Sequence, residues 1–224
     1  MLVLIFDTET TGLPLTRTLN KDLLDKWPYI VQLSYILYDT EKCKKIGEKD
    51  WIIQLPPEIE INAETTEIHG ITTDISRNQG ISIQIALDEF IRDWKFADLI
   101  VAHNMTFDLN MLQVELLRLS NNNIVTYNPF YDDLQKANNL YCTMQESIEL
   151  CNIIKTYKNG HTYVKFPKLS ELHEKLFLTT PSNLHNALND VIVCLRCFYK
   201  LKFDKDILEL DADMKEVAST LNMC

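Results

Sequence analysis

Two acidic side chains at the end of a short apolar stretch are the first residues of this chain whose types and spacing could do chemistry. Leu2 to Phe6 are all apolar, Asp7 follows them directly, and Glu9 stands two positions further on. Residues two apart on a β-strand point to the same face of the sheet. Half-buried like charges repel each other and resist desolvation. The pair therefore predicts a site that gathers protons or hard cations, unless Asp7 only ends the strand and Glu9 faces water.

Two later acids could join this pair. Asp108 falls in the first turn of an expected helix, where an acid is also ordinary because the helix dipole favours it. Asp190 is harder to explain by structure alone, since its expected helix is apolar on most sides and the nearest basic residue, Arg196, lies on another face. A metal ion would supply the missing positive charge.

His185 stands five residues before Asp190. In one continuous helix the two side chains would point about 140° apart. Pro181 and the cap-like residues Ser182 and Asn183 instead place His185 in a loop or a first helical turn, free to turn toward the same site. A lone histidine is more often an ordinary surface or core residue, but an imidazole titrates near neutral pH and suits a general base.

Composition limits the class of protein. Hydrophobic residues make up 46% and charged residues 24% of the 224 residues, which is typical of one globular domain. Every apolar run falls short of the ~18 residues that cross a bilayer, and the first run ends at Asp7, too early for a signal peptide. We therefore expect an intracellular protein, cytoplasmic or nuclear and not secreted, without membrane contact.

The net charge of −10 argues against binding of nucleic acid over the whole surface, because phosphate neutralisation calls for lysine and arginine. A local basic track, or phosphate held through bound metal ions, stays compatible with it. The six cysteines lie mostly in apolar segments, as free thiols do in reducing compartments. Cys194 and Cys197 form a CxxC without a second pair at zinc spacing, which favours core packing over zinc.

The elements that must position these residues change in kind along the chain. Strands are expected first, at residues 2–6, Ile30–Tyr38 and Trp51–Leu55, with a helical turn near 21–26 and a charged hairpin over 39–50. Strands joined by short links pair antiparallel, which predicts a three-stranded meander. A short helix is expected at Asn62–Gly70, capped by Asn62 and ended by Gly70.

Helices alternate with strands in the second half. Apolar spacing predicts helices over 82–94, 106–119, 143–154, from Pro167 and over 184–201, with strands at 98–102 and 140–143. Thr143 to Glu146 has the capping-box pattern. Residues 121–140 are expected to form an irregular insertion, and the acidic tail 203–224 either docks as a helix or frays. This order predicts an α/β fold with a mixed sheet flanked by helices.

Taken together, these residues resemble the three motifs of the DEDDh family, the 3′→5′ exonucleases of ribonuclease H-like fold, which include polymerase proofreading subunits, ribonuclease T and oligoribonuclease. The motifs are Asp7-x-Glu9 with Thr10-Thr11-Gly12-Leu13, then His103-Asn104 with Phe107-Asp108, then His185-x4-Asp190. Segments 27–33, 68–72 and 168–172 fit in order as well. The resemblance covers residues 1–201 and implies a ribonuclease H-like mixed five-stranded sheet, an antiparallel meander followed by parallel strands, with residues 1–202 as the exonuclease domain.

The resemblance also implies a reaction. Asp7, Glu9 and Asp190 would hold one divalent cation and Asp7 the other, with Asp108 completing the site directly or through water. Oxygen ligands favour Mg²⁺ or Mn²⁺, two ions per active site. His185 would take the proton of the attacking water, and the product would be a nucleoside 5′-monophosphate from a 3′ end.

Further residues are expected to bind the substrate. In relatives, the residues matching Thr11, Gly12 and Leu13 lie against the terminal nucleotide, and those matching Ile68 and His69 border its base; we add Thr10 to this set. His103 and Asn104 either contact the substrate or only brace the helix of Asp108. His185 in place of a tyrosine assigns the chain to the histidine branch of the family.

We expect a metal-dependent 3′→5′ exonuclease that acts on single-stranded or frayed DNA, slightly preferred over RNA. The alternatives are an RNA 3′-end exonuclease of the same family, a non-catalytic nucleic-acid-binding or polymerase-accessory module, and an unrelated metal-binding or storage protein. A polymerase subunit is one candidate partner, and the oligomeric state stays open. Residues 155–168 hold four lysines, His161, Tyr157, Tyr163 and Phe166 without an acid, which fits either a track for single-stranded nucleic acid or a solvated loop.

Overall fold

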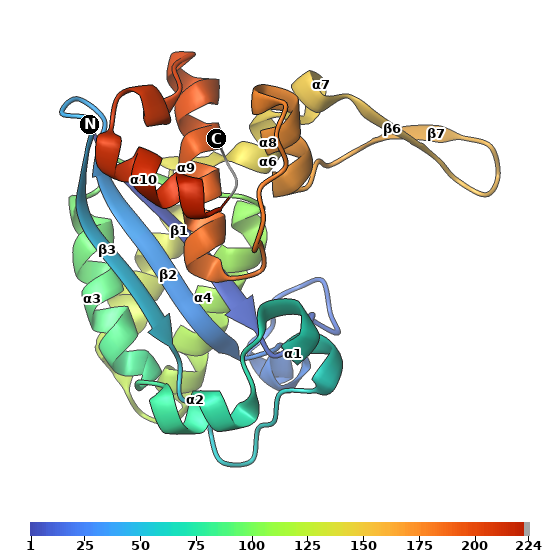
Figure 1. Cartoon of the computed structure of the whole chain (residues 1–224). Coiled ribbons are helices and arrows are strands. Elements are labelled where there is room, and N and C mark those ends of the chain that lie inside the picture. The colour runs from blue at the N-terminus through green and yellow to red at the C-terminus, as the bar shows by residue number, and fades with distance from the viewer. Residues whose placement is uncertain (222–224) are drawn as a thin grey trace.

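A mixed five-stranded sheet forms the centre of the molecule in the computed structural model, which describes residues 1–221 (Figure 1). The strands are β1 (Leu2–Thr10), β2 (Ile30–Asp39), β3 (Lys44–Ile52), β4 (Leu99–Ala102) and β5 (Leu140–Cys142), in the order β3-β2-β1-β4-β5. The first three form an antiparallel meander, and β4 and β5 run parallel to β1. The predicted sheet and its mixed topology are confirmed.

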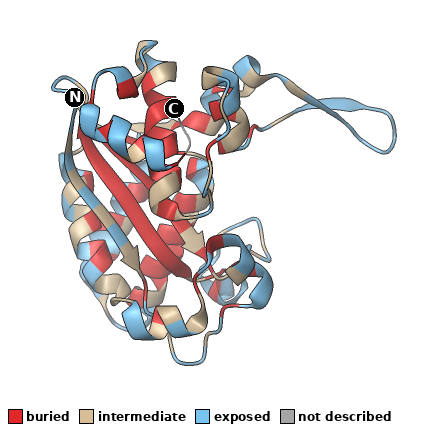
Figure 2. Cartoon of the chain, viewed as in Figure 1, coloured by how far each residue is buried: buried red, intermediate tan, exposed pale blue. Residues whose placement is uncertain are grey.

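Strand β1 lies at the centre of the sheet and is buried on both faces (Figure 2). Leu4 and Phe6 belong to one apolar core, and Val3 and Ile5 belong to the other. Helices α3 (Ile83–Phe96) and α4 (Met105–Asn121) pack in the first core, and helices α8 (Leu169–Phe177), α9 (Ala187–Phe203) and α10 (Ala212–Thr220) pack in the second. Alternation along the strand therefore turns Asp7 and Glu9 toward the side of α9.

Strand β1 extends well beyond its parallel neighbour. The pairing with β4 ends at Ile5 opposite Val101, whereas the pairing with β2 continues to Thr10. The second half of β1 therefore keeps a free edge on the β4 side. Helix α4 begins three residues after β4 ends, and its first turn comes to this free edge.

The meander differs from the prediction in the bounds of its third strand. Residues 44–52 form β3, and most of the charged segment 39–50 is strand instead of hairpin loop. The prediction of a strand at Trp51–Leu55 was wrong because β3 is an edge strand whose residues alternate between exposed and half-buried. Charged side chains are common on such edges, where they discourage pairing with other chains.

Short helical segments lie within the meander, between β1 and β2, and after it, between β3 and α3. Helix α1 (Ala63–His69) begins and ends as predicted, since the Asn62 side chain accepts a hydrogen bond from Thr65 N and Gly70 adopts a left-handed conformation. The 3₁₀ turn η1 (Lys21–Lys26) confirms the expected helical turn. Helix α2 (Thr73–Gln79) was not predicted, because its seven mostly polar residues carry no apolar period.

Residues 121–140 are not irregular, contrary to the prediction. They contain the 3₁₀ turn η2 (Val125–Tyr127) and helix α5 (Asn128–Lys136), whose Phe130 and Leu134 are buried in the core shared with α3 and α4. These two apolar residues, four apart, place one face of the helix on the core. The sequence shows too few apolar positions there to predict it.

The helix predicted over 143–154 is interrupted. It consists of α6 (Thr143–Glu146) and α7 (Ile148–Cys151), separated at Ser147, whose hydroxyl donates to Thr143 O at 2.6 Å. The predicted capping box is wrong, because Thr143 lies inside α6 and its hydroxyl contacts Ala102 O and His103 Nδ1. A competing tertiary contact therefore replaced the local cap.

Residues 153–165 form a two-stranded hairpin of β6 (Ile153–Thr156) and β7 (Thr162–Lys165) that projects from the body (Figure 1). Helix α8 starts at Leu169 with Lys168 as its N-cap, two residues later than predicted from Pro167. Helix α9 starts at Ala187, three residues later than predicted, because the Asn186 side chain caps it, so Leu184 and His185 precede the helix.

The acidic tail docks on the body, one of the two alternatives predicted. After the 3₁₀ turn η3 (Ile207–Glu209), helix α10 places Met214 and Ala218 in the same core as α9, together with Leu221. The remaining tail residues, 222–224, lie outside the described residues. The division of the chain at residue 202 stays a prediction.

Cys194 and Cys197 lie in the core between α9 and the sheet as free thiols, which confirms core packing for the CxxC. Burial raises the pKa of the Cys194 thiol well above its ordinary value. Within residues 1–221, no helix is both long enough and apolar enough to cross a membrane.

Candidate active site

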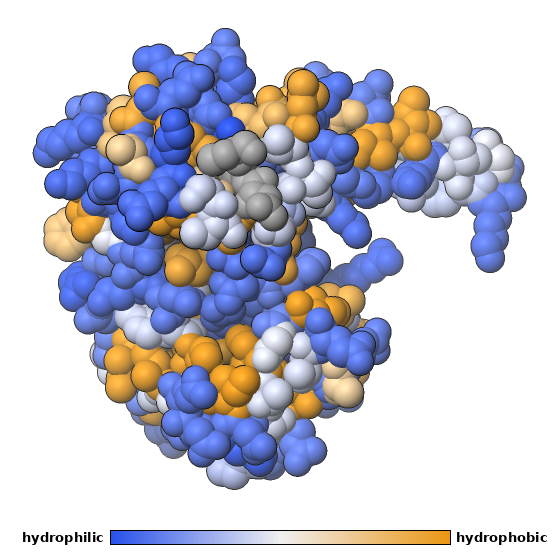
Figure 3. All heavy atoms as spheres, viewed as in Figure 1, coloured by the Kyte–Doolittle hydropathy of each residue, from blue (hydrophilic) through white to orange (hydrophobic). Residues whose placement is uncertain are grey.

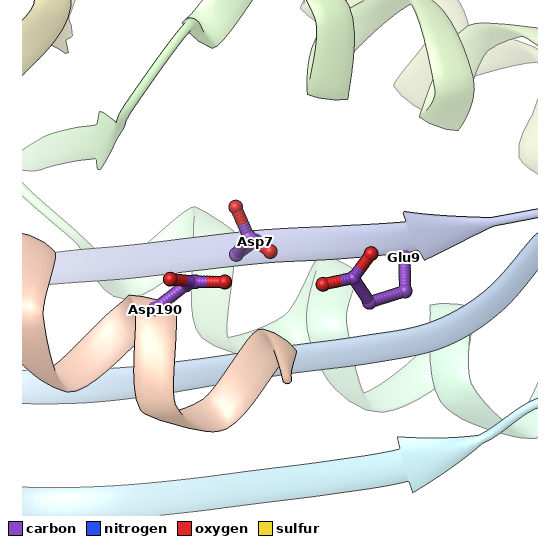
Figure 4. Close-up of side chains that lie close together, drawn as sticks. All are labelled: Asp7, Glu9 and Asp190. Atoms are coloured by element: carbon purple, nitrogen blue, oxygen red, sulfur yellow. The ribbon is translucent and has the colours of Figure 1, made fainter. Parts of the chain in front are cut away.

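Three carboxylates converge at the end of β1. Asp7 and Glu9 project from the strand and Asp190 from the first turn of α9, and one oxygen of each lies within 4.8 Å of the others. Figure 4 shows the three side chains turned toward a common space between the strand and the helix. The strand alternation that places Asp7 and Glu9 on the α9 face thus brings them to Asp190, as the sequence predicted.

A buried glutamine sets the position of α9 relative to β1. Gln32 pairs with Glu9 across β1 and β2, and its Oε1 accepts a hydrogen bond from Ala187 N at 3.1 Å, at the first residue of the helix. Gln32 Nε2 donates in turn to Asp50 Oδ1 at 2.7 Å. The prediction missed this role of Gln32. Its signal was a polar residue within the apolar strand segment 30–37.

Asp108 reaches the site from the opposite face of the sheet. Its Oδ1 accepts hydrogen bonds from Thr8 N at 3.1 Å and from Thr8 Oγ1 at 2.7 Å. Asp108 thus bonds the free edge of β1 beyond the end of β4, where the Thr8 amide has no neighbouring strand to donate to. Asp108 therefore lies beside the three-carboxylate cluster. It contacts Thr8, whose side chain points to the face of the sheet opposite to that of Asp7 and Glu9.

The environment of these four acids disfavours their charged forms. Burial, followed by the charges of Asp190 and Asp108, raises the pKa of Glu9 to about 8. Burial raises the pKa of Asp108 to about 7 against the two Thr8 hydrogen bonds, and that of Asp190 to about 7 against the His185 amide. Burial and the three neighbouring acids also raise the pKa of Asp7 well above its usual range.

Among the described residues, no lysine or arginine forms an ion pair with any of these four acids. Arg196, the nearest base along α9, pairs instead with Asp206 at 2.6 Å. Buried carboxylates without a cation from the protein are costly. A cluster made of carboxylate oxygens fits hard divalent cations such as Mg²⁺ or Mn²⁺, so the residues present suit a metal site.

His185 lies at the rim of the cluster. It is exposed and precedes α9 in a left-handed conformation with φ of 69°, as the prediction of a loop position required. Its backbone amide donates to Asp190 Oδ2 at 2.9 Å, which connects its position to that of the acid. Within the described residues no hydrogen bond to its imidazole ring is found, so the ring is available to a ligand.

A cleft of about 740 Å³ joins these groups. Of the residues predicted to bind substrate, Leu13, His103 and Asn104 line it together with the four acids and His185. Thr10, Thr11, Gly12, Ile68 and His69 are outside its lining. The Thr65 hydroxyl of α1 donates to Thr11 O at 3.4 Å, which brings α1 to the loop that follows β1.

The predicted substrate-binding residues of α1 and of the loop after β1 differ in solvent exposure. Leu13 is 81% exposed and Ile68 is also exposed, so both can meet a ligand. Thr10 is buried and donates to Gly12 O at 2.7 Å, and His69 is buried with its Nδ1 accepting from Ile71 N. Burial lowers the pKa of the His69 imidazole, which favours its neutral form.

His103 holds structure together at the cleft wall. Its Nε2 donates to Pro167 O at 3.1 Å, because a carbonyl can only accept, and its Nδ1 faces Thr143 Oγ1 at 3.0 Å. Burial lowers the pKa of His103 to about 4, so the ring is neutral near pH 7. The ring therefore connects the end of β4 to the segment between the hairpin and α8, and both of its nitrogens are engaged.

Asn104 is exposed and adopts a left-handed conformation at the start of α4, where its carbonyl accepts from Phe107 N at 2.8 Å. The cleft is also lined by residues that the prediction did not assign to it: Thr8, Phe107, Met144, Phe166, Pro167, Lys168, Leu169, Ser170 and Leu184. Phe166 and Lys168 belong to the basic and aromatic stretch noted in the sequence, which was the available signal.

Comparison with known proteins places this site in a class. The three carboxylates could hold a metal ion, and residues 4–198 match the RNase T family, described as exonuclease. The chain belongs to this exonuclease family, within the DEDDh 3′→5′ exonucleases that the motifs resemble. No protein with a curated description matches the chain by sequence.

Solved structures of exonuclease I share the fold. One structure of exonuclease I superposes with a TM-score of 0.59 and 20% identity, over 91% of this chain and 41% of that chain. E. coli exonuclease I in complex with a dA16 oligonucleotide gives a TM-score of 0.56 and 17% identity, over the same shares of the two chains. Exonuclease I from Methylocaldum szegediense gives 0.57 and 14%, over 98% and 44%. The chain thus spans less than half the length of these structures.

Proposed function

We propose that this protein removes nucleoside 5′-monophosphates from the 3′ end of single-stranded or frayed DNA with the help of two divalent cations. The observation that carries the proposal is the convergence of Asp7, Glu9 and Asp190 within 4.8 Å, beside an exposed histidine and with no ion pair to a lysine or arginine of residues 1–221. Such a cluster has little structural use, because its charges oppose folding.

We assign one ion to Asp7, Glu9 and Asp190 and the second to Asp7, with Asp108 completing the site directly or through water. The cluster found among residues 1–221 offers only carboxylate oxygens, which favours Mg²⁺ or Mn²⁺ over zinc. When bound, the ions supply Lewis-acid stabilisation of the negative charge that develops on the phosphate. Thr8 positions Asp108 through its two hydrogen bonds, and Gln32 positions Asp190 through the start of α9.

We assign the proton transfer to His185. In the hydrolysis of the terminal phosphodiester, a water oxygen bonds to phosphorus and the bond from phosphorus to the 3′-oxygen breaks. The departing 3′-oxygen takes a proton from solvent water, so that the shortened strand ends in a 3′-hydroxyl. The His185 imidazole takes the proton that the water loses, since it lies at the rim of the cleft with its ring available. The His185 amide bond to Asp190 couples the position of the base to that of a metal ligand.

We infer that the cleft takes a single strand. The exposed side chains of Leu13 and Phe166, which both line the cleft, offer apolar surfaces to unpaired bases. The likeness to exonuclease I in complex with dA16 and with dT13 supports DNA as the substrate. We further propose that residues 1–202 form the exonuclease domain, and that a polymerase subunit is a candidate partner.

The test is release of mononucleotides from single-stranded DNA and from RNA of the same sequence, with Mg²⁺, Mn²⁺ or EDTA. We expect metal-dependent release from 3′-labelled strands and stepwise shortening of 5′-labelled ones, lost in Asp7→Ala and His185→Ala. Asp133→Ala on α5 is the matched control, because Asp133 is exposed and outside the cleft lining.

Faster release from RNA than from DNA would reassign the substrate. Substrate that is bound and stays intact with both metals would overturn the catalytic assignment in favour of a non-catalytic nucleic-acid-binding or polymerase-accessory module.

A further inference from the structure

The projecting hairpin differs in charge from the rest of the protein. We call residues 153–168 the arm: strand β6, its turn, strand β7 and the root segment that leads into α8. The arm contains four lysines (Lys155, Lys158, Lys165 and Lys168) and neither an aspartate nor a glutamate, whereas the whole chain carries a net charge of −10. It is therefore the part of the protein that attracts a polyanion.

The two faces of the arm are chemically different. Lys155 pairs with Tyr163 and Ile153 with Lys165 across the strands, while Ile154 pairs with Val164 and Thr156 with Thr162. Cross-strand neighbours point to the same face. One face therefore carries Lys155, Tyr163 and Lys165, with Ile153 at its base, and the other face carries only aliphatic and threonine side chains. A solvated loop, the other interpretation of this stretch, would not sort its residues in this way.

A pair of stacked tyrosines lies on the lysine face. The rings of Tyr157 and Tyr163 are 4.3 Å apart with an interplanar angle of 28°. Tyr157 is 55% exposed and Tyr163 is 40% exposed. Lys155 and Lys158 form no ion pair among the described residues. Exposed rings beside available lysines are what a single strand needs for stacking of its bases and neutralisation of its phosphates.

The root of the arm forms part of the cleft wall. Phe166, Pro167 and Lys168 line the cleft that contains the four acids, and His103 Nε2 bonds Pro167 O. Lys165 pairs with Glu171 of α8 at 2.5 Å, so this lysine fixes the root and is not available to a ligand. A strand whose 3′ end occupies the cleft would leave it along Phe166 and Lys168 and meet the lysine face next.

The surface view agrees with this path. In Figure 3 the surface is hollowed below the arm, between it and the region of α1, and the arm extends well beyond the body. The turn at the tip of the arm comes about seven residues before Pro167 in the sequence. At the rise of a β-strand, this corresponds to a length of about 23 Å from Pro167 to the tip. The arm is thus long enough to follow several nucleotides of a strand outside the cleft.

We propose that the arm is a binding surface for the single-stranded nucleic acid that leads out of the cleft. Tyr157 and Tyr163 stack on its bases, and Lys155, Lys158 and Lys168 neutralise its phosphates. The inference rests on the proposed function for the identity of the ligand. It assigns affinity for long strands to the arm and leaves bond cleavage to the cleft.

Binding is measured first, by fluorescence anisotropy of a labelled 20-nucleotide single strand with Asp7→Asn protein in Mg²⁺, so that cleavage does not interfere. We expect Tyr157→Ala/Tyr163→Ala to bind about tenfold more weakly, from the loss of base stacking. Lys155→Glu/Lys158→Glu should weaken binding at least as much, and the dependence of log Kd on log salt should flatten by about 1.4.

Lys44→Glu/Lys205→Glu is the matched control, since it changes the net charge equally at positions remote from the cleft. Lys44 of β3 is next to Asp39 of β2 in the strand register, at the end of the sheet that is far from Glu9. Lys205 follows the C-terminal end of α9. Thermal unfolding should be unchanged in both arm variants, because no arm residue before Pro167 belongs to the apolar cores.

Wild-type affinity and salt dependence in both arm variants would overturn the inference. Light scattering that shows a dimer of wild type and a monomer of Ile154→Ser/Val164→Ser, with unchanged DNA affinity, would also overturn it and assign the arm to self-association. Loss of affinity in the control as large as in the arm variants would overturn it as well, because general charge would then explain the effect.

Hydrolysis of a dinucleotide separates this inference from the proposed function. A dinucleotide spans about 3.4 Å when stacked and cannot extend from the cleft along the arm. The arm variants should therefore cleave it at the wild-type rate while they lose activity on the 20-nucleotide strand. A wild-type protein that cleaves neither substrate would refute the proposed function, and the binding measurement would still test the arm.

Discussion

Helix α4 carries two buried carboxylates with different surroundings. Asp108 in its first turn is 2% exposed, and Glu115, two turns further on, is 5% exposed. Glu115 Oε1 accepts from Arg118 at 2.7 Å and from Ile30 N at 3.2 Å. Asp108 has the two Thr8 hydrogen bonds and three neighbouring acids. One helix thus contains a carboxylate with a protein cation and one without.

The partner of Glu115 explains its role. Arg118 donates to the carbonyls of Leu24, Trp27 and Pro28 and lies over the Tyr29 ring at 3.5 Å from its centroid. The Glu115–Arg118 pair therefore fastens the segment before β2 to α4 and is complete within the protein. The difference teaches that burial of an acid alone does not identify a functional site. What identifies it is burial without a cation supplied by the chain.

Removal of the Arg118 side chain should leave Glu115 as a buried carboxylate without a positive partner, as Asp108 is, but with no metal site to compensate. We expect Arg118→Ala to lower the free energy of unfolding by about 3–5 kcal/mol, because Glu115 would stay buried without its partner. Urea unfolding measures this. Glu115→Gln/Arg118→Met should lose much less, and an equal loss in both variants would mean that the pair contributes packing and not charge compensation.

Substitution of an acid in the three-carboxylate cluster should lower activity strongly and leave stability unchanged or higher. Asp7→Asn should lower the rate of hydrolysis by about 10³-fold, or about 4 kcal/mol, through loss of metal-dependent stabilisation. In EDTA the same variant should unfold at a temperature equal to or above that of wild type, since one of four repelling charges is gone. A variant that loses activity and stability together would show that Asp7 has a structural role like that of Glu115.

Substitution of Gln32 tests whether the carboxylate cluster depends on the hydrogen bond that positions the start of α9. Gln32→Leu removes the hydrogen bond to Ala187 N, and we expect metal affinity and activity to fall by about 10–100-fold, as for other residues that orient metal ligands. Titration of Mn²⁺ against activity measures this. Ser34→Ala, which removes only a bond to Asp50, is the control and should change the metal requirement little.

The pH dependence of stability should sharpen the comparison further. The pKa values of Glu9, Asp108 and Asp190 are raised in the folded protein to about 8, 7 and 7. Between about pH 4 and these values the folded state therefore holds more protons than the unfolded state, and stability falls as the pH rises. In EDTA we expect a lower Tm at pH 8 than at pH 6, by about 2–4 °C.

Mg²⁺ or Mn²⁺ should raise the Tm more at pH 8 than at pH 6, because the ions bind the deprotonated carboxylates and compete with protons. Differential scanning fluorimetry at both pH values checks this. A metal-induced increase in Tm that is the same at pH 6 and pH 8 would contradict the assignment of these acids as the ligands.

Local sequence determined much of the site. The two-residue spacing of Asp7 and Glu9 placed both on one face of a strand, and Pro181, Ser182 and Asn183 indicated a loop or a first helical turn for His185. The strand order of the meander and the motifs of the exonuclease family were also readable, because they depend on alternation and on short segments. Asn62 and Gly70 marked the ends of α1 for the same reason, since helix caps are local contacts.

Contacts between distant segments were decided only by the tertiary structure. Asp108 reaches the cluster because β1 continues past β4 and offers Thr8, which no pattern near Asp108 could indicate. The roles of Gln32 and His103, the interruption at Ser147 and the position of the arm beside the cleft likewise depend on residues far apart in the chain. Side-chain spacing predicts which face a residue occupies, but only the packed sheet and helices decide which groups meet there, because pairing registers and strand lengths are set by burial of the whole core.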